Sequence, residues 1–378
     1  MRLIQFLPYF PPHSGGLEQV AQHISSSFVE GKYGEVVNLT FSVGQQKEEG
    51  SYMQDGYKVI ILPAFDLIYS FPFPKFWRKS FWKGIKEAKQ FGADIIQTHT
   101  RFFLSSFLGG LLAKLWKKKW VHIEHGGGFV EDISGWKRAI AWCYDQTLGR
   151  LVFASADRVV SINKANIPFI SKFTKASKIS VIYNGISFPS TLLKKKKRKK
   201  AELGFVGRLA PGKGVHILLE AIKAIVKSGE TDFHLSLIGD GTERDSLESF
   251  VKDHQFSCYV TFLGKKPRDE VVSFLSEEVD ILVNPSFREG LPTTVLEGLL
   301  AQCVVIATDV GGTREISRKD DLILVQPKSA EQLREAITPL LNNCSNLQGL
   351  SFQGIKENFS WEKNVSEYFK IYQNLLKK

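Results

Sequence analysis

The chain has 378 residues, of which 50 are Lys or Arg and 39 are Asp or Glu, so its formal net charge is +11. At about 150 residues per domain this length indicates two domains, and the 43% hydrophobic and 24% charged residues exclude a disordered or fibrous chain. The positive charge favours anionic partners, among them nucleotides, phosphorylated sugars, membrane surfaces and nucleic acid.

The sequence gives no signal for secretion or membrane insertion. Its start lacks the basic, apolar and small-residue order of a signal peptide. The most apolar segment, Phe102–Trp116, contains Lys114 and is shorter than the roughly 20 residues of a spanning helix. The four cysteines are far apart, which indicates neither a disulfide framework nor a zinc site. We therefore expect a cytoplasmic protein.

The N-terminal half alternates short apolar runs with longer stretches. The runs are β-branched or aliphatic and predict strands, and the stretches between them have the length of helices. This alternation predicts a parallel sheet covered by helices, an α/β domain of the doubly wound type. The strands are expected at Leu3–Leu7, Val36–Phe41, Val59–Leu62, Asp94–Gln97, Trp120–Glu124 and Arg158–Ile162.

Glycines follow the first expected strand. Gly15 and Gly16 would let backbone approach a phosphate or a sugar, and the helix from Leu17 would present its amides to an anion. A plain glycine-rich turn explains these residues equally well.

Residues 71–91 are rich in aromatic and basic side chains. On one helix the apolar residues would share one face and the lysines another, which is typical of a helix at an anionic membrane surface. A helix packed on the sheet with its lysines in water is the alternative. The apolar face would comprise Trp77, Phe81, Ile85 and Ala88, the basic face Lys79, Lys83 and Lys86, and the best lipid contacts Phe71, Phe73 and Trp82.

Histidines end two of the expected strands. His99 and His125 both stand where a strand runs into a loop, and ligands bind beyond the carboxyl ends of parallel strands. His122 alternates with His125 and fits a buried structural role. Taken singly, a histidine in such a position is more often structural than catalytic.

A block of basic residues separates the two halves. Residues 194–200 are all Lys or Arg, and such like charges repel one another and stay solvated, which predicts a linker. A contact with nucleic acid or lipid is the alternative. The expected organisation is a first domain at 1–188, the linker at 189–201, a second domain at 202–360 and an amphipathic helix at 361–378.

The strand rhythm restarts after the linker and predicts a second doubly wound domain. Its first loop carries Arg208 and Lys213 around a Pro-Gly turn, which allows two cations to converge on one diphosphate. A surface turn with solvated cations is the alternative. The strands are expected at Gly204–Val206, His234–Ile238, Val260–Phe262, Ile281–Val283, Val304–Ala307 and Leu322–Val325.

A further loop of this half carries two carboxylates. Glu289 precedes a helix that Thr293 and Thr294 are expected to cap, and Glu297 lies about one turn into that helix. The helix amides suit a phosphate, and Glu297 can accept hydrogen bonds from ribose hydroxyls. Favourable interaction of Glu297 with the helix dipole is the alternative.

Together these motifs resemble the family 4 glycosyltransferases of the GT-B fold, over nearly the whole chain and most strongly from Gly204 to Ile316. The resemblance implies two Rossmann-like domains with an interdomain cleft, and a retaining, metal-free transfer from a nucleotide sugar. The motifs that carry it are Gly15-Gly16, His125, Tyr183-Asn184-Gly185, Gly207-Arg208 with Lys213-Gly214, IGDG at 238–241, Glu289 and Glu297 with seven residues between them, and VGGTREI at 310–316.

The resemblance also implies the roles of individual residues. The positions of Arg208 and Lys213 bind the diphosphate, and that of Glu297 binds the ribose. The positions of Glu289 and His125 lie at the donor sugar. Catalytic roles are thus expected for His125, Glu289, Arg208 and Lys213, and substrate binding also for Gly15, Gly16, His99, Asn184, Gly290, Leu291, Thr293 and Glu297.

No cofactor or metal ion is expected, since the chain contains no Asp-x-Asp triplet to ligate a divalent ion between donor phosphates. From the family, uridine is the preferred base, and the acceptor is a glycan or lipid-linked glycan of surface polysaccharide or glycolipid synthesis, at the inner face of the cell membrane. One alternative is another GT-B enzyme, such as a nucleotide-sugar epimerase. The other is a basic nucleic-acid-binding protein, but no recognisable nucleic-acid module is present, so this partner is not expected.

Overall fold

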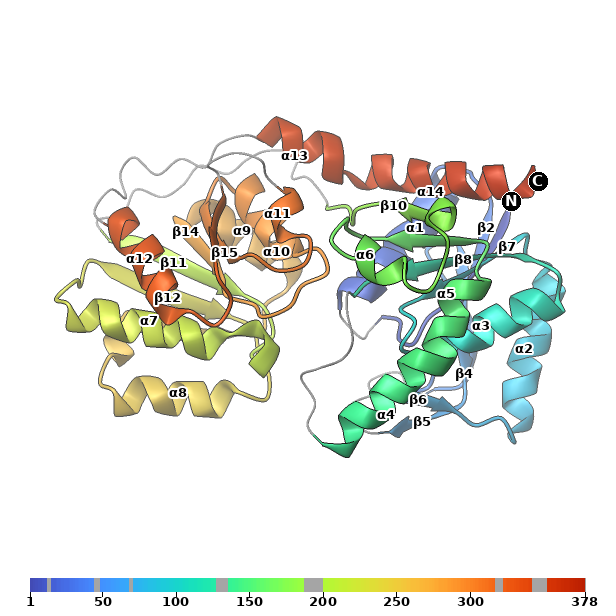
Figure 1. Ribbon diagram of the computed structural model, residues 1–378, viewed down its shortest axis with the longest axis horizontal. Coiled ribbons are helices and arrows are strands. Elements are labelled where there is room, and N and C mark those ends of the chain that lie inside the picture. The colour runs from blue at the N-terminus through green and yellow to red at the C-terminus, as the bar shows by residue number, and fades with distance from the viewer. Residues whose placement is uncertain are drawn as a thin grey trace. The chain divides into compact units, whose positions relative to one another are not determined.

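The computed structural model describes residues 1–11, 15–43, 48–67, 71–126, 135–186, 200–316, 322–341 and 352–377. The chain divides into two compact units, one formed by Met1–Gly185 with Trp361–Lys378 and the other by Ile186–Ser360 (Figure 1). The C-terminal segment thus belongs to the first unit. Residues 189–199 of the expected linker lie outside the described residues, and the first strand of the second unit begins at Ala201.

The first unit is built on an eight-stranded sheet in the order β10-β9-β8-β7-β1-β2-β4-β3. All neighbours pair in parallel except β3 with β4. The six expected strands are present within two residues at either end, and β3, β10 and the β5–β6 hairpin are additional. The strands are β1 Arg2–Phe6, β2 Glu35–Phe41, β3 Gly50–Gln54, β4 Tyr57–Leu62, β5 Ala64–Leu67, β6 Phe71–Pro74, β7 Ile95–His99, β8 Lys119–Glu124, β9 Arg158–Ser161 and β10 Ile179–Val181.

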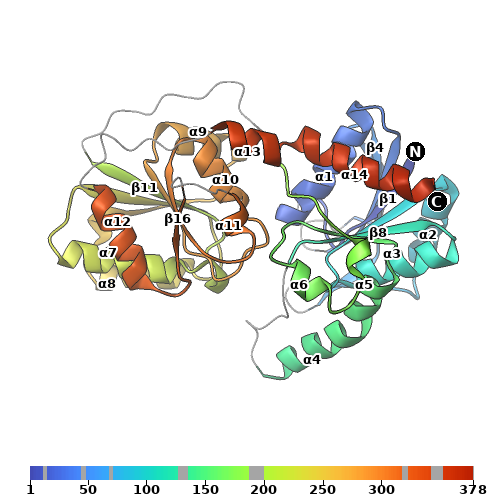
Figure 2. The ribbon, with the colours of Figure 1, turned by 45° about the horizontal axis from the view of Figure 1, so that its top comes forward.

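Helices cover both faces of this sheet. The apolar core on one face is filled from α2, α3, α5 and α6. On the other face α14, the C-terminal helix, packs beside α1 (Figure 2). The helices are α1 Gly16–Glu30, α2 Lys79–Phe91, α3 Leu104–Leu115, α4 Trp136–Tyr144, a π-helical turn Asp145–Gly149, α5 Arg150–Ser155, α6 Ile167–Ile170 and α14 Trp361–Leu376, with a 3₁₀ turn at Ala176–Lys178.

The second unit has a six-stranded, wholly parallel sheet in the order β13-β12-β11-β14-β15-β16. Its strands are β11 Ala201–Val206, β12 Phe233–Ile238, β13 Val260–Gly264, β14 Ile281–Asn284, β15 Val304–Thr308 and β16 Leu322–Val325. Its helices are α7 Val215–Lys227, α8 Arg244–Asp253, α9 Arg268–Glu277, α10 Thr293–Leu300, α11 Thr313–Ile316, α12 Ala330–Leu341 and α13 Phe352–Phe359, with 3₁₀ turns at Pro211–Lys213 and Ser257–Tyr259.

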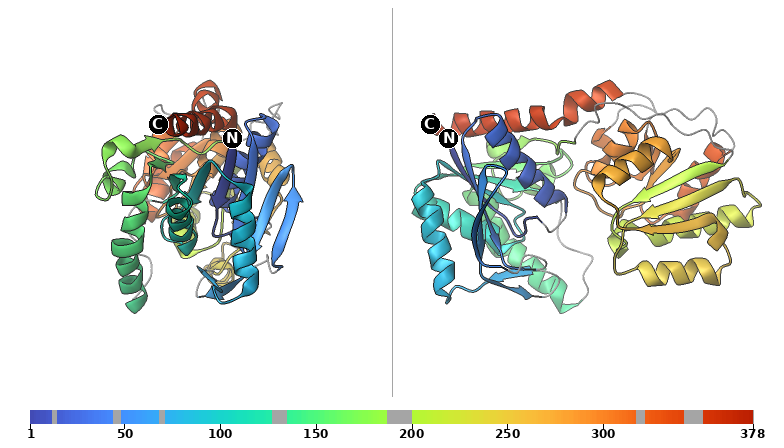
Figure 3. Two further views of the ribbon diagram at one scale, coloured as in Figure 1. Left: turned by 90° about the vertical axis from the view of Figure 1, so that its right-hand side faces the viewer. Right: turned by 180° about the vertical axis from the view of Figure 1, so that it is seen from behind.

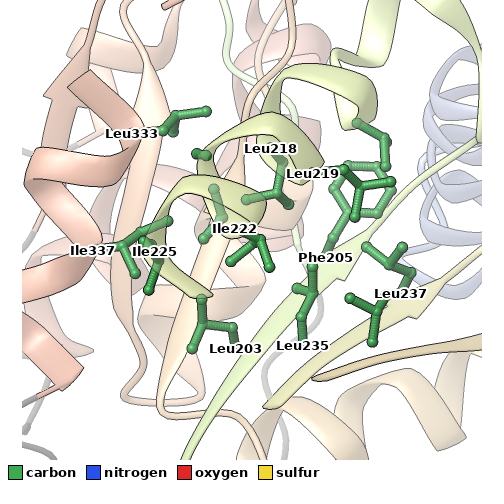
Figure 4. Packing of buried hydrophobic residues seen from close by; sticks show 14 of the residues in the cluster. Leu203, Phe205, Leu218, Leu219, Ile222, Ile225, Leu235, Leu237, Leu333 and Ile337 are labelled. Carbon is green, nitrogen blue, oxygen red and sulfur yellow. The ribbon is translucent and has the colours of Figure 1, made fainter. Parts of the chain in front are cut away.

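Helices α7, α8 and α12 pack on one side of this sheet, and α9 and α10 on the other (Figure 3). Figure 4 shows leucines and isoleucines of α7 and α12 meeting side chains of β11 and β12 in one core. Because α7 has its apolar residues on one face, that face packs on the sheet, and because α7 follows β11 through a short loop, its N-terminus lies at the carboxyl edge of the sheet. The two doubly wound α/β units confirm the expected fold class.

Residues 71–91 do not form the single helix that the pattern suggested. Residues 71–74 are strand β6, and α2 starts only at Lys79. Phe81 and Ile85 are buried in the core, so for this face the packed-helix alternative holds. Phe81 is therefore not a lipid contact.

Other aromatic residues of this segment do reach the surface. Trp77, which precedes the helix, is 66% exposed, while Trp82 is 57% and Phe73 is 37% exposed. Phe71 instead stacks on Phe103, with 5.6–6.4 Å between ring centroids in its contacts with neighbouring rings. Of the three expected lipid contacts, Phe71 is thus part of an aromatic cluster inside the unit.

Among the described residues, no helix is long and apolar enough to cross a membrane. The same residues contain no group of three or more His, Cys, Asp or Glu side chains placed to hold a metal ion.

Candidate functional site

The loop after β11 carries the two expected cations. Arg208 is exposed, and Lys213 ends a 3₁₀ turn that leads directly into α7. Between them and the helix, Gly214 has φ 65°, and a Cβ there would lie 2.2 Å from the carbonyl oxygen of Pro285. The amide of Phe287 also donates to the carbonyl of Gly212 at 2.9 Å. The cation loop is therefore held against the loop that follows β14.

Lys213 and Glu289, separated by 76 positions in sequence, meet in this structure. The Lys213 ammonium lies 2.7 Å from Glu289 Oε1, and both side chains are largely shielded from solvent. Such a short contact between ionised groups is a charge-assisted hydrogen bond. The fold thus places two expected catalytic residues at one point.

The motif at 310–316 shapes the Glu289 loop. Gly311 has φ 54°, and a Cβ there would lie 1.9 Å from the carbonyl oxygen of Glu289. The amide of Gly312 donates to the carbonyl of Gly290 at 2.8 Å. The loop after β15 therefore supports the loop after β14, which is a physical role for these glycines.

Helix α10 begins where the sequence places it but is capped differently. Pro292 occupies the N-cap, and the helix has no side-chain capping bond, so the expected threonine caps are wrong. Thr294 Oγ1 instead accepts from Asn284 Nδ2 at 3.1 Å, while Thr293 is half-buried and Leu291 is buried. Because no side chain caps this end, its amides can serve an external anion.

Glu297 pairs with a cation that the sequence did not single out. Arg268, at the start of α9, lies 2.9 Å from Glu297 Oε1. Burial raises the pKa of Glu297 above its usual value, against the opposing charge of Arg268. Arg268 and Glu297 lie on different helices and 29 positions apart in sequence. Such a salt bridge produces no local sequence pattern, which is why the sequence analysis missed Arg268.

The IGDG motif closes the end of β12 onto β11. Gly239 has φ 142°, and a Cβ there would lie 1.7 Å from the carbonyl oxygen of Gly207. The amide of Leu209 donates to the carbonyl of Asp240 at 3.0 Å. This motif therefore fixes the backbone on either side of Arg208.

In the first unit, Gly15 and Gly16 begin α1 at the carboxyl edge of the sheet. A Cβ at Gly15 would lie 2.4 Å from Glu18 Oε2, whereas a Cβ at Gly16 would meet open space. Glu18 is buried in the first turn of α1, and sequence reasoning passed over it. Burial lowers the pKa of His125, and the negative charges of Glu124 and then Glu18 oppose this lowering.

His99 and His125 are brought together. His99 Nδ1 lies 3.0 Å from His125 Nε2. Burial lowers the pKa of His125 to about 4 and that of His99 well below its usual value, so both rings are neutral near pH 7. His99 is fully buried, so any contribution it makes to substrate binding runs through His125.

A buried ion cluster supports the loop that carries His125. Glu124, the preceding residue, accepts from Arg101 Nη1 at 3.0 Å and from the amide of Gly126 at 3.2 Å. Arg101 Nε also donates to Asp145 Oδ1 at 3.0 Å. Burial alone would raise the pKa of Glu124, but Arg101 and a hydrogen bond from His122 lower it to about 2. His122 is thus buried and structural.

Asn184 is buried where the chain leaves the first unit, and its Oδ1 has no hydrogen-bond partner among the described residues. A Cβ at the next residue, Gly185, would lie 2.5 Å from the ring of Trp361. The Tyr183-Asn184-Gly185 motif therefore includes a close approach of two chain segments.

A hollow of about 730 Å³ in the second unit contains none of the expected site residues. It lies along β12, β13 and α9, and its lining includes five acidic side chains beside one lysine, Lys266. Such a lining disfavours a phosphorylated ligand. The five are Glu202, Asp269, Glu270, Glu277 and Glu278.

Comparisons with known proteins agree with this geometry. The model of the family described as Glycosyltransferase Family 4 matches residues 14–188, and that described as Glycosyl transferases group 1 matches residues 192–356. An uncharacterized glycosyltransferase of Methanocaldococcus jannaschii is 30% identical, over 100% of this chain and 99% of that protein.

Two further proteins are similar. The N,N'-diacetylbacillosaminyl-diphospho-undecaprenol alpha-1,3-N-acetylgalactosaminyltransferase of Campylobacter jejuni is 28% identical, over 79% of this chain and 82% of that protein. The crystal structure of Anabaena HepE in complex with UDP-glucose has a TM-score of 0.77 and 16% identity, over 99% of this chain and 100% of the other. This second likeness shows the fold.

Proposed function

Because the chain belongs to the family 4 glycosyltransferases, we propose that it moves a sugar from a nucleoside diphosphate sugar to a glycan or lipid-linked acceptor. We further propose that the configuration at the anomeric carbon is retained and that no metal ion takes part. The observation that carries the proposal is the contact of Lys213 with Glu289, four residues before the uncapped start of α10.

The charges of this loop suit a departing diphosphate. As the bond from the sugar to the phosphate breaks, negative charge grows on the phosphate oxygens. Lys213, Arg208 and the first amides of α10 are preorganised partners for that charge, and such preorganised groups lower the barrier most where charge develops. In this proposal they take the place of a metal ion.

The proposed transfer breaks the bond from the anomeric carbon to the phosphate oxygen and forms a bond from that carbon to the acceptor oxygen on the same face. The acceptor's proton passes to the departing diphosphate. Glu289 and Glu297 each face a cation, at 2.7 and 2.9 Å. This pairing supports roles in holding the donor sugar and the ribose rather than an attack on the anomeric carbon. We assign His125 to the transferred sugar.

We propose UDP as the donor's nucleotide, which the complex of Anabaena HepE with UDP-glucose supports. The test is calorimetric titration with UDP, GDP and ADP in a chelator, repeated with Mg²⁺. We expect one of them to bind without metal, and Lys213→Ala to weaken that binding about tenfold or more through loss of one charged hydrogen bond. Lys227→Ala, at the exposed far end of α7, is the matched control.

Catalysis is tested with the sugar nucleotide that binds. Product formed only with an acceptor supports transfer, whereas isomerised sugar nucleotide without acceptor supports the epimerase alternative. Anomeric proton couplings of the product decide between retention and inversion. Binding that requires Mg²⁺, or that survives Lys213→Ala unchanged, would contradict the proposed donor site.

For the acceptor we propose a lipid-linked glycan reached from an anionic membrane surface, as the diphospho-undecaprenol substrate in the name of the Campylobacter jejuni relative suggests. The exposed aromatic residues Phe73, Trp77 and Trp82 adjoin the exposed lysines of α2. Aromatic side chains enter the headgroup region while lysines meet anionic lipids. The lysines are Lys79, Lys83 and Lys86.

Vesicle flotation tests this surface. We expect the protein to float with vesicles that contain phosphatidylglycerol but not with pure phosphatidylcholine, and the double substitution Trp77→Glu with Trp82→Glu to abolish flotation without unfolding the protein. Leu376→Glu places the same charge at a residue 45% exposed in α14 and should not change flotation. Equal loss of flotation in the double variant and in Leu376→Glu would contradict the proposal that this surface binds the membrane.

A further inference from the structure

A buried polar network lies behind His125. Gln5 of β1, Gln97 and His99 of β7, and Tyr372 of α14 are all fully buried. They lie on the sheet face that α1 and α14 cover, and Ser25 of α1 and Asn38 of β2 extend the network at Gln5 Nε2, at 2.8 and 2.9 Å. Buried polar groups must be hydrogen-bonded, so the direction of each hydrogen bond in this network is constrained by the next.

The orientation of both glutamines follows from one backbone carbonyl. Gln5 Nε2 donates to the carbonyl oxygen of Ala21 at 3.0 Å, which has no alternative to accepting. Gln5 Oε1 therefore faces Gln97, which must present its Nε2, at 2.6 Å. Gln97 Oε1 then faces the hydroxyl of Tyr372, which donates to it.

The second hydrogen on Gln97 Nε2 sets the tautomer of His99. Gln97 Nε2 lies 3.0 Å from His99 Nε2. A hydrogen bond there requires His99 Nε2 to accept, so neutral His99 carries its proton on Nδ1. That proton is donated to His125 Nε2 at 3.0 Å. Neutral His125, accepting at Nε2, then carries its own proton on Nδ1.

The opposite tautomer is less well satisfied. His99 Nε2 also lies 3.0 Å from Gln5 Oε1, to which it would donate in that form. One N–H of Gln97 would then face the N–H of His99 and remain buried without an acceptor. His125 would donate from Nε2, leaving Nδ1 an acceptor. Among the described residues, His125 Nδ1 has no hydrogen-bond partner. A ligand would therefore meet either a donor or an acceptor at Nδ1, depending on the tautomer.

We propose that Gln5 and Gln97 are positioning residues that fix His125 in the tautomer protonated on Nδ1, so that it presents a hydrogen-bond donor to an oxygen of the transferred sugar. The sugar's part in this statement rests on the proposed function. The tautomer itself does not, because it follows from the network within the first unit.

The test is long-range ¹H–¹⁵N correlation NMR of the histidine side chains in the full-length protein at pH 7.5, with His125→Asn to assign its signals. We expect His99 and His125 both to show the pattern of protonation on Nδ1. Tyr372→Phe leaves Gln97 Nε2 bound to Gln5 Oε1 at 2.6 Å, so this variant should keep both tautomers.

Two variants sharpen this test. Gln97→Leu removes the donor beside His99 Nε2 and leaves that nitrogen only Gln5 Oε1, an acceptor at 3.0 Å, so both rings should shift toward protonation on Nε2. Tyr368→Phe is a further control, because Tyr368 is a buried tyrosine one turn earlier in α14 whose hydroxyl has no hydrogen-bond partner among the described residues. It should leave both tautomers and the melting temperature unchanged.

Turnover completes the test. Gln97→Leu should lower kcat about tenfold, the worth of one hydrogen bond, with the donor KM within about twofold. A wild-type His125 protonated on Nε2, tautomers unmoved in folded Gln97→Leu, or a tautomer shift without loss of kcat would each overturn the proposal. An inactive protein with the expected tautomers would instead contradict the proposed function alone.

Discussion

At the scale of single residues, charged side chains near the carboxyl ends of the strands form pairs of a cation with a carboxylate in both units. In the second unit Lys213 faces Glu289 and Arg268 faces Glu297. In both pairs the carboxylate is largely shielded and the cation is partly exposed, so a ligand can reach the cation. The Arg101–Glu124 pair of the first unit is almost wholly buried. Removing one partner of such a pair strands the other charge.

Glu124→Gln should therefore destabilise the first unit by about 3 kcal/mol, the typical cost of breaking a buried ion pair. The pKa of Glu124 is lowered to about 2 in the fold from an ordinary value of 4.5. Its stabilisation is thus complete above about pH 4.5 and is lost as the pH falls toward 2. Denaturant unfolding at pH 7 and pH 3 measures the difference, which should be smaller at pH 3.

The control for this prediction is Glu49→Gln. Glu49 pairs with Arg78 at 2.8 Å on the surface of the same unit. Solvent screens this pair, so its loss should cost at most about 1 kcal/mol. If the two variants lost the same free energy of unfolding, the buried Arg101–Glu124 pair would stabilise the unit no more than a surface pair.

At the scale of elements, the loops after parallel strands are held by backbone contacts that tolerate only glycine. Gly214, Gly239 and Gly311 have positive φ, and a Cβ on each would clash with a carbonyl oxygen of a neighbouring loop. The strands bring these loops to one edge, and the glycines allow them to interlock. The orientation of Glu289 is thus a property of several elements together.

Gly311→Ala should displace the Glu289–Gly290 loop, since its Cβ would lie 1.9 Å from the Glu289 carbonyl oxygen. The left-handed backbone adds strain of about 1–2 kcal/mol. We expect nucleotide affinity to fall about tenfold, together with the melting temperature of the second unit. Gly212→Ala, whose Cβ would meet no atom within 4 Å, should leave the melting temperature unchanged. Calorimetry measures both quantities.

At the scale of the whole molecule, two separate apolar cores lie in one chain. One is formed by β11, β12, α7 and α12 with their neighbours, and the other by the sheet of the first unit with α2, α3 and α5. Each core is contained within one unit, so each unit should unfold cooperatively by itself. Helix α14 completes the first unit although it follows the second in sequence.

Differential scanning calorimetry should accordingly resolve two transitions. A nucleoside diphosphate at 100 times its Kd stabilises the unit that binds it by about 2.7 kcal/mol, and should raise that transition by roughly 5 °C or more. Because Lys213, Glu289 and Glu297 all lie in the second unit, we expect only its transition to move. Lys213→Ala should remove the shift, whereas a shift confined to the first unit would contradict the site.

The sequence by itself determined the two parallel sheets and the positions of most strands. Uniform apolar runs mark strands buried on both faces, and the intervening segments are long enough to be crossover helices. It also placed Arg208, Lys213, Glu289 and Glu297 in the segments that follow strands. The place of such a residue along the chain follows from the strand just before it, and no distant contact is needed to predict it. The edge elements β3, β5, β6 and β10 were missed because they are short or partly exposed and lack such runs.

Only the tertiary structure decided which of these residues meet. The contact of Arg268 with Glu297 and the hydrogen bond from Tyr372 to Gln97 join segments 29 and 275 positions apart, and no local pattern encodes them. It also decided that His99 is buried behind His125 rather than exposed to substrate. Periodicity specifies which face of an element is buried, but the partner on that face is chosen by packing among all elements, and packing is a property of the folded chain.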